Sequence, residues 1–285
     1  MKAIIRHRLN FRSSSGIHNN RVSTNPPGTQ VDVIGGPAPG EGNLISGNGD
    51  IEIQGNGIIL SNGTGFPIRG NFIGTDVTGV NALPNTGRGI ALNGASNFNL
   101  IEGNTIAFNG LDGVDANETT GNGILFNSIH SNGALGIDAG LGSGVTANDG
   151  SSELDGVQNY PVLTLAQSLP GSFRVTGTFT SAPSQLFEIR FYDNATCDPS
   201  GFGEGERQVG VTDLGTNSDG NASFDITFPF PVTSGRALVA TARDLTSSST
   251  SEFSACVIVF SPEPATAPVT TSGVATTGMA RPPLR

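Results

Sequence analysis

The sequence predicts an all-β protein in which a solenoid of about four or five stacked coils precedes an antiparallel β-sandwich. Two observations predict it: a short template recurs along the first half of the chain, and regularly spaced alternating apolar runs replace it afterwards. The expected divisions are a disordered N-terminal arm over 1–30, the solenoid over 31–159, the sandwich over 160–260, and a Pro-, Thr- and Ser-rich tail or linker over 261–285.

The template consists of glycine or phenylalanine, then asparagine, any residue and isoleucine. Its last two copies extend further, because Asn104 and Asn127 begin segments whose asparagine, glycine and branched apolar positions coincide at an offset of 23 residues. A period of this size with strand-like pieces is typical of a solenoid, whose repeats bury their apolar sides by stacking. The four copies are Gly42–Ile45, Gly70–Ile73, Gly103–Ile106 and Phe126–Ile129.

Apolar residues alternate with polar ones in three stretches of each repeat, which predicts three half-buried strands per coil. Asparagine and glycine suit the bends between them because both tolerate positive φ. Ordinary hairpins are the alternative, but they do not explain why the columns align in three strands at once. Stacked asparagines are expected to bond from coil to coil as a ladder: Asn43, Asn71, Asn104 and Asn127.

From about Val31 to Leu163 these motifs, together with Gly74–Gly79, resemble the right-handed parallel β-helix repeats of large bacterial secreted and surface proteins. The resemblance implies a right-handed parallel β-helix with a C-terminal β-sandwich. It implies little about function, because this fold carries lyases, hydrolases, adhesins and inert stalks alike.

After Tyr160 the period disappears and short strands follow, separated by turn residues. Alternation of the kind seen over 187–191 and 224–228 favours an immunoglobulin-like sandwich. Cys197 and Cys256 are the only two cysteines, and both fall here. A pair in a secreted-looking β domain favours a disulfide, with a buried free pair as the alternative.

Composition and charge limit which binding partners and which cellular compartment are expected. The net charge is −10, and the basic residues gather near the N-terminus, so the remainder is acidic and nucleic-acid binding is not expected. No apolar run is long enough for membrane insertion. We expect an extracellular or cell-surface protein. The start shows no signal peptide, which favours an incomplete chain over a short protein with a disordered arm.

Asp115 and Asp138 occupy one outward column on neighbouring coils, about 4.8 Å apart. Three interpretations stay open: solvated aspartates or aspartates bonding turn amides, a cation site, or a catalytic pair like that of a retaining glycosidase. Arg88 is the arginine that would accompany such chemistry. A second column, with Glu41, Arg69 and Glu102, is read as an ion ladder.

Other candidates have plainer explanations. His130 stands alone in its column and is expected at the surface. The acidic loop with Asp149, Glu153 and Asp155 joins the two halves, and either binds Ca²⁺ or serves as a plain junction. No other cofactor is expected.

No complete catalytic set is present, so the sequence favours a non-catalytic secreted or cell-surface scaffold of the adhesin type. The alternative is a polysaccharide lyase or glycoside hydrolase that uses the outer face of the solenoid. Polysaccharides or cell-surface components are the expected partners. The exposed strand edges of the first coil also favour end-to-end self-association.

Overall fold

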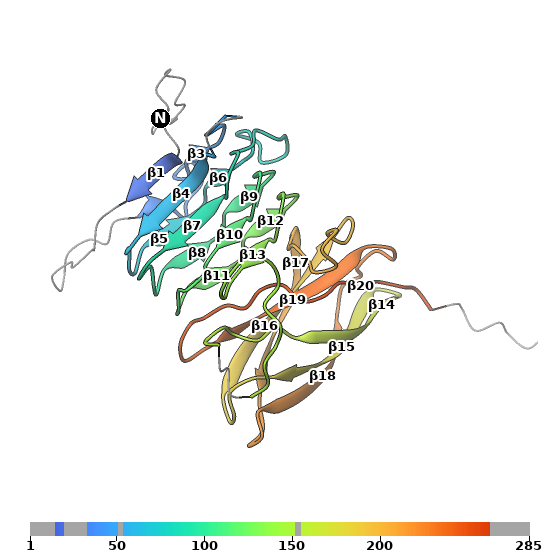
Figure 1. The fold of residues 1–285 in the computed structure, drawn as a ribbon. Helices are drawn as coiled ribbons and strands as arrows, with labels where there is room; N and C mark the ends of the chain where they lie inside the picture. Colours follow the sequence, from blue (N-terminus) through green and yellow to red (C-terminus); the bar gives the residue numbers. More distant parts are fainter. Residues whose placement is uncertain (1–14, 20–32, 51–53, 152–154, 263–285) are drawn as a thin grey trace, which may run out of the picture.

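The computed structural model describes residues 15–19, 33–50, 54–151 and 155–262, and within these ranges the regular structure consists of strands without helices. Two regions lie side by side (Figure 1). Residues 34–138 carry three parallel sheets and are called the parallel region; residues 162–258 carry two antiparallel sheets and are called the antiparallel region. No helix in the described part of the chain has the length and apolarity needed to cross a membrane.

The parallel region is built in rounds of three strands, one for each of three sheets. The chain visits sheet B, then sheet C, then sheet A, and repeats this order four times in the described residues. Sheet A contains β1 (Ser15–Asn19), β4 (Asn56–Ser61), β7 (Ile90–Asn93), β10 (Val114–Asp115) and β13 (Ile137–Asp138). Sheet B contains β2 (Ile34–Gly35), β5 (Pro67–Arg69), β8 (Leu100–Glu102) and β11 (Gly123–Leu125). Sheet C contains β3 (Leu44–Ile45), β6 (Phe72–Ile73), β9 (Thr105–Ala107) and β12 (Ser128–His130).

Columns of isoleucine and other branched residues fill the space between the three sheets. Register places each such residue opposite its counterpart in the next round, as in Ile68, Ile101 and Ile124 of sheet B. These side chains are 0 to 3% exposed, as expected for the inward positions of alternating strands. The topology fits the predicted parallel β-helix.

Strand β1 departs from the sequence-based expectation. Residues 1–30 were predicted to form a disordered arm, yet Ser15–Asn19 pairs in parallel with β4 and adds a strand to sheet A. The register of this pairing places Ile17 opposite Ile58. The other residues of the arm lie outside the described ranges.

Asparagines at the corners hold successive rounds together. Asn104 Oδ1 accepts from both the N–H and the side-chain amide of Asn71, each at 2.9 Å, and Asn127 Oδ1 does the same for Asn104. Asn43 bonds to Asn71 in the same way at 3.0 Å. The four template asparagines therefore form one continuous ladder, and each amide satisfies polar groups that the bend would otherwise bury unpaired.

Two further ladders run along other corners. One ends on Asn132, which bonds Asn109, and Asn109 in turn bonds Asn85. The other contains Asn99 and Asn122. All five of these asparagines are at most 7% exposed.

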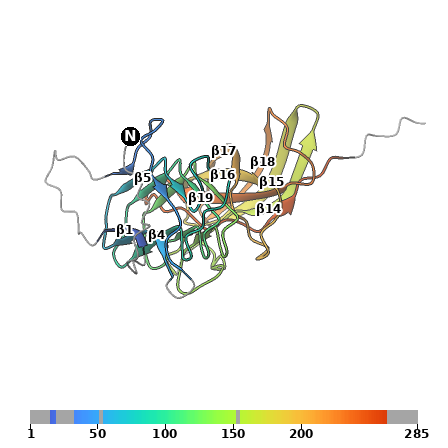
Figure 2. The same cartoon turned by 90° about the horizontal axis from the view of Figure 1, so that it is seen from above.

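The antiparallel region contains two sheets that fit a β-sandwich. Sheet D contains β14 (Val162–Leu169), β15 (Ser172–Thr180) and β18 (Asn221–Phe228). Sheet E contains β17 (Arg207–Gly215), β16 (Leu186–Asn194), β19 (Ala237–Asp244) and β20 (Val257–Ile258). Figure 2 shows sheet E on the side nearer the parallel region and sheet D beyond it.

Aromatic side chains form the core between these two sheets. Phe179 of sheet D meets Phe187 of sheet E edge to face with ring centroids 4.9 Å apart, and Phe191 meets Phe224 at 5.7 Å. Cys197 and Cys256 are joined by a disulfide across 59 residues of sequence. A disulfide of this kind indicates a non-reducing environment.

The two regions share a hydrophobic core where they meet. Tyr192, Val239 and Phe253 of the antiparallel region belong to the same buried cluster as the isoleucines of the parallel region. Phe253 fills a gap that only glycine leaves open, because a Cβ at Gly136 or Gly205 would approach its ring to 2.9 or 2.6 Å. The last round of the parallel region is therefore covered by sheet E and its loops.

Candidate functional site

Two neighbouring strands of sheet A carry the aspartates that the sequence singled out. Asp115 ends β10 and Asp138 ends β13, and the register places them directly opposite each other. They are 6% and 1% exposed, so the interpretation as a solvated pair is wrong. Asp115 does accept a hydrogen bond from the N–H of Asn117 at 3.1 Å, the turn-amide role considered for it.

The loop that follows β13 explains this burial. Asn117 donates its side-chain amide to the Gly142 carbonyl at 3.0 Å, and Thr146 donates its hydroxyl to the Ala139 carbonyl at 2.5 Å. Glu252 of the antiparallel region accepts from the N–H groups of Ala139 and Thr146, each at 2.9 Å. Residues 139–146, called the cover loop, are thus held over the end of sheet A. Sequence columns cannot show such a covering segment.

Arg88 forms ion pairs with two carboxylates. Its Nε lies 2.7 Å from Asp115 Oδ2 and 3.2 Å from Asp112 Oδ2. The other oxygen of Asp112 accepts from the Leu135 N–H at 3.2 Å. Arg88 therefore neutralises charge that the strand ends bury, and Asp112 is a member of this cluster that sequence reasoning missed.

Burial favours the neutral form of Asp115 and Asp138. Burial, reinforced by the nearby Asp112 and Asp115, raises the pKa of Asp138 to about 6. Burial also raises the pKa of Asp115, opposed by the Asn117 hydrogen bond and by Arg88. Two adjacent buried carboxyls with raised pKa values are common at functional sites, although ion-pair networks produce the same effect.

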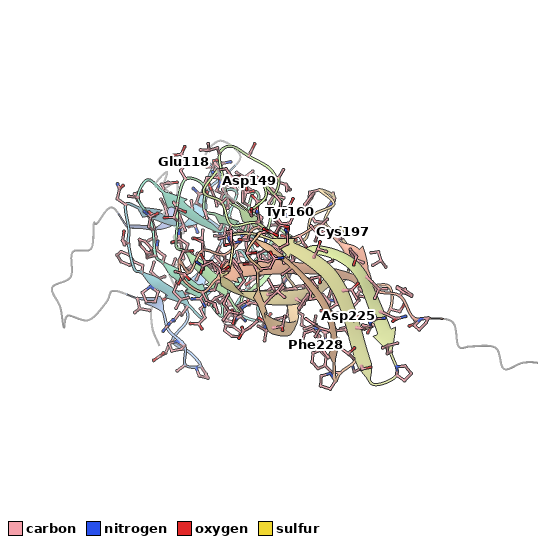
Figure 3. The ribbon with its side chains drawn as sticks, turned by 90° about the horizontal axis from the view of Figure 1, so that it is seen from below. Glu118, Asp149, Tyr160, Cys197, Asp225 and Phe228 are labelled. Atoms are coloured by element: carbon pink, nitrogen blue, oxygen red, sulfur yellow. A yellow bond between two sulfur atoms is a disulfide. The ribbon has the colours of Figure 1, made fainter. Side chains whose placement is uncertain are left out.

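A cavity of about 450 Å³ adjoins the cluster. Its walls come from both regions, with the loop near the disulfide on one side. Figure 3 shows Cys197 and Tyr160 near this meeting of the two regions, whereas Asp225 and Phe228 lie farther out on the sandwich. The polar lining residues are Arg88, Asp112, Asn132, Ser143, Asp198 and Ser200.

The second predicted column is only partly an ion ladder. Arg69 pairs with Glu102 at 3.1 Å, as expected. Glu41 does not belong to it, because the residue opposite Arg69 in sheet B is Gly35 and Glu41 accepts from the Ala38 N–H instead. His130 is half-buried against Phe108, and this burial lowers its pKa.

The acidic loop between the regions is organised by hydrogen bonds. Asp149 Oδ2 accepts from the Asp155 N–H at 3.2 Å, and Asp155 Oδ1 accepts from the Val157 N–H at 2.9 Å. Glu153 lies outside the described residues. Among those the structure describes, no group of three or more His, Cys, Asp or Glu side chains is placed to hold a metal ion.

Two glutamates at the junction were missed by the sequence analysis. Glu204 takes the place of the next asparagine in a ladder, since its Oε1 accepts from both the N–H and the amide of Asn132 at 2.9 Å. Its Oε2 accepts from the Ser131 N–H. Burial raises the pKa of Glu204 to about 7, and burial also raises that of Glu252 to about 7. Neither glutamate lies in the repeated segment, so no period could point to it.

A departure from the repeated template lies at the same junction and can be seen in the sequence. Phe126 stands where two earlier copies have a glycine at positive φ, and it adopts φ 55° itself. Arg190 of β16 stacks over its ring at 3.9 Å. This cation–π contact helps hold a residue type that seldom adopts such a backbone.

No protein-family model matches the chain, and no curated protein matches it in sequence.

Proposed function

We propose that the protein is a non-catalytic, secreted or cell-surface scaffold of the adhesin type. In it, a right-handed parallel β-helix forms the shaft and an immunoglobulin-like sandwich closes one end. The observation that carries this proposal is the state of the candidate catalytic groups. Asp115 and Asp138 are buried, and Arg88 is held by two carboxylates, so these groups are not free to meet a polymer.

Two arguments support the proposed right-handedness of the β-helix and the proposed immunoglobulin-like topology of the sandwich. Parallel strands joined by crossovers within one sheet are right-handed in nearly every known case. The strand orders β14-β15-β18 and β17-β16-β19-β20 match an immunoglobulin-like sandwich, in which the two sheets exchange strands through Greek-key connections.

The disulfide and the net charge support the proposed location. The disulfide needs a non-reducing compartment, and a net charge of −10 keeps a display protein soluble. Polysaccharides or cell-surface components are the partners we propose, met along the polar outer side of the rounds. Copies of the chain are proposed to associate through the open ends of sheets B and C at β2 and β3, where no earlier strand of the described residues pairs.

One observation favours a second function, a polysaccharide lyase or glycoside hydrolase. The cavity beside Arg88 and Asp112 has a volume in the range of small-molecule sites, and the adjacent carboxyls have raised pKa values. Such an enzyme would need the cover loop to open.

Incubation with polymers separates the two functions. The purified chain is mixed with pectins, alginates and glycosaminoglycans, with and without Ca²⁺, and reducing ends and unsaturated products are measured. A scaffold gives no cleavage in the wild type or in Asp138→Asn. Cleavage by the wild type that disappears in Asp138→Asn, but survives in Asp225→Asn at the sandwich surface, would establish the enzyme instead.

A further inference from the structure

The carboxylate of Asp138 is buried without a hydrogen-bond partner. Both of its oxygens are inaccessible and neither receives a hydrogen bond of normal geometry, although the Asn117 amide and the Gly144 N–H lie near enough to oppose the rise of its pKa. Burying an ionised carboxylate without a partner destabilises the fold by roughly several kcal/mol, so native structures supply a partner or a proton.

A second unpaired acceptor lies beside it. Asn117 Oδ1 is also buried without a partner, and its orientation is fixed because Nδ2 of the same amide donates to the Gly142 carbonyl at 3.0 Å. Three buried oxygen atoms on these two side chains therefore lack a hydrogen bond of normal geometry. One proton on Asp138 would satisfy one oxygen, whereas a calcium ion takes several oxygen ligands at once.

The net charge around Asp138 also favours a bound cation. Asp112, Asp115 and Asp138 carry three negative charges when ionised and Arg88 carries one positive charge, which leaves two negative charges. Arg88 contacts Asp112 and Asp115, while no ion pair is formed by Asp138 in the described residues. Glu252, which faces the cluster through the cover loop, adds further negative charge when ionised. A divalent cation next to Asp138 would balance the cluster.

We propose that Asp138 and Asn117 bind one calcium ion between the end of sheet A and the cover loop. Calcium accepts carboxylate, amide and main-chain oxygens together in flexible geometry, so the site does not need three carboxylates. Magnesium demands stricter octahedral geometry and is expected to bind less well. Because only one carboxylate is free, the affinity should lie in the weak extracellular range, about 10⁻⁴ to 10⁻³ M.

This site differs from the acidic loop that carries Asp149 and Asp155. The two lie on the same side of the molecule, as Glu118 (next to Asn117) and Asp149 show in Figure 3. Asp149 also has one buried oxygen without a hydrogen-bond partner. Asp149→Asn is therefore a matched control, since it neutralises the same residue type on the same side.

The test is calorimetric titration of the full chain with calcium chloride at neutral pH after removal of metals, repeated with magnesium chloride. The wild type and Asp149→Asn should bind one calcium ion, and magnesium at least about tenfold more weakly. Asp138→Asn and, separately, Asn117→Ala should weaken calcium binding about tenfold or more.

Folding is checked by melting in a chelator. Asp138→Asn removes a buried charge, so its melting temperature without metal should equal or exceed that of the wild type, and calcium should no longer raise it. If Asp138→Asn does not fold, the Asn117→Ala titration decides. The proposal is overturned if the wild type binds no calcium, or if Asp149→Asn abolishes binding while Asp138→Asn or Asn117→Ala retains it.

Discussion

The parallel and antiparallel regions solve the same problem, the burial of polar backbone, by different means. In the parallel region an asparagine of the next round satisfies the polar groups of many bends, as Asn104 does for Asn71. In the antiparallel region the backbone pairs within sheets, and the core is filled by aromatic rings such as Phe187 and Phe191. The parallel region therefore repeats one kind of contact from round to round, whereas the antiparallel region uses a different set of side chains for each contact.

The junction belongs to neither scheme. In the ladder that runs through Asn109 and Asn132, Glu204 takes the place of the next asparagine. Phe253 packs between Gly136 and Gly205 at the end of the apolar column. The stability of the parallel region should therefore depend on residues far from it in sequence. The four predictions below test this comparison of the two regions and their junction, in order of decreasing expected effect.

Phe253→Ala should lower the free energy of unfolding by about 3–5 kcal/mol, because it empties a buried site shared by both regions. Phe230→Ala is the control, since Phe230 is 39% exposed on the antiparallel region and its loss should cost far less. Urea denaturation followed by circular dichroism measures both. Equal losses in the two variants would show that the regions do not share a core.

Replacing Cys197 and Cys256 together by serine should lower the free energy of unfolding by up to about 4 kcal/mol, from a closed loop of 59 residues. The effect should appear in the antiparallel region first, where the bond lies. Thermal melts with and without reductant provide the measurement, and the double variant should be insensitive to reductant. A wild-type melt unchanged by reductant would contradict the prediction.

The junction should weaken as pH rises. Burial raises the pKa of Glu204 and of Glu252 from 4.5 to about 7, so the folded chain holds these protons where the unfolded chain has lost them. Their contribution is full at pH below the unfolded value and is lost as pH rises toward 7, by at most about 3 kcal/mol for each group.

Urea denaturation in chelator between about pH 5 and about pH 8 measures this slope. Glu204→Gln should reduce it, because the amide does not titrate. Glu188→Gln on β16 is the control, since it leaves the junction glutamates in place. A slope unaltered by Glu204→Gln would refute the assignment.

Asn104→Ala should lower the free energy of unfolding by about 2 kcal/mol, because it leaves the Asn71 N–H without its buried acceptor. Asn43→Ala, at the half-buried end of the same ladder, should cost less than half as much. Chemical denaturation of the two variants compares them directly. Similar losses would mean that the ladder does not act through burial.

In the parallel region the sequence predicted the contacts that repeat and missed those that occur once, whereas in the antiparallel region it did predict the single disulfide. Template positions foretold the isoleucine columns and the asparagine contacts, because a partner one period away is visible as a match. The burial of Asp138 could not be foretold, since the cover loop and Glu252 come from outside its column. Phe126 was a usable signal, because a large residue in a glycine position indicates a local partner, here Arg190.

The asparagine ladder also bears on how such a chain can lengthen. Asn104 Oδ1 accepts from the N–H and the side-chain amide of Asn71 before it, and Asn104 donates its own N–H and side-chain amide to Asn127 Oδ1 after it, all at 2.9 Å. Gene duplication of one internal round would therefore supply a newcomer with ready-made neighbours on both sides. The hydrogen bonds of Glu204 to Asn132 and the packing of Phe253 against Gly136 lie in the final round, so selection can vary the number of rounds before it while these contacts stay the same.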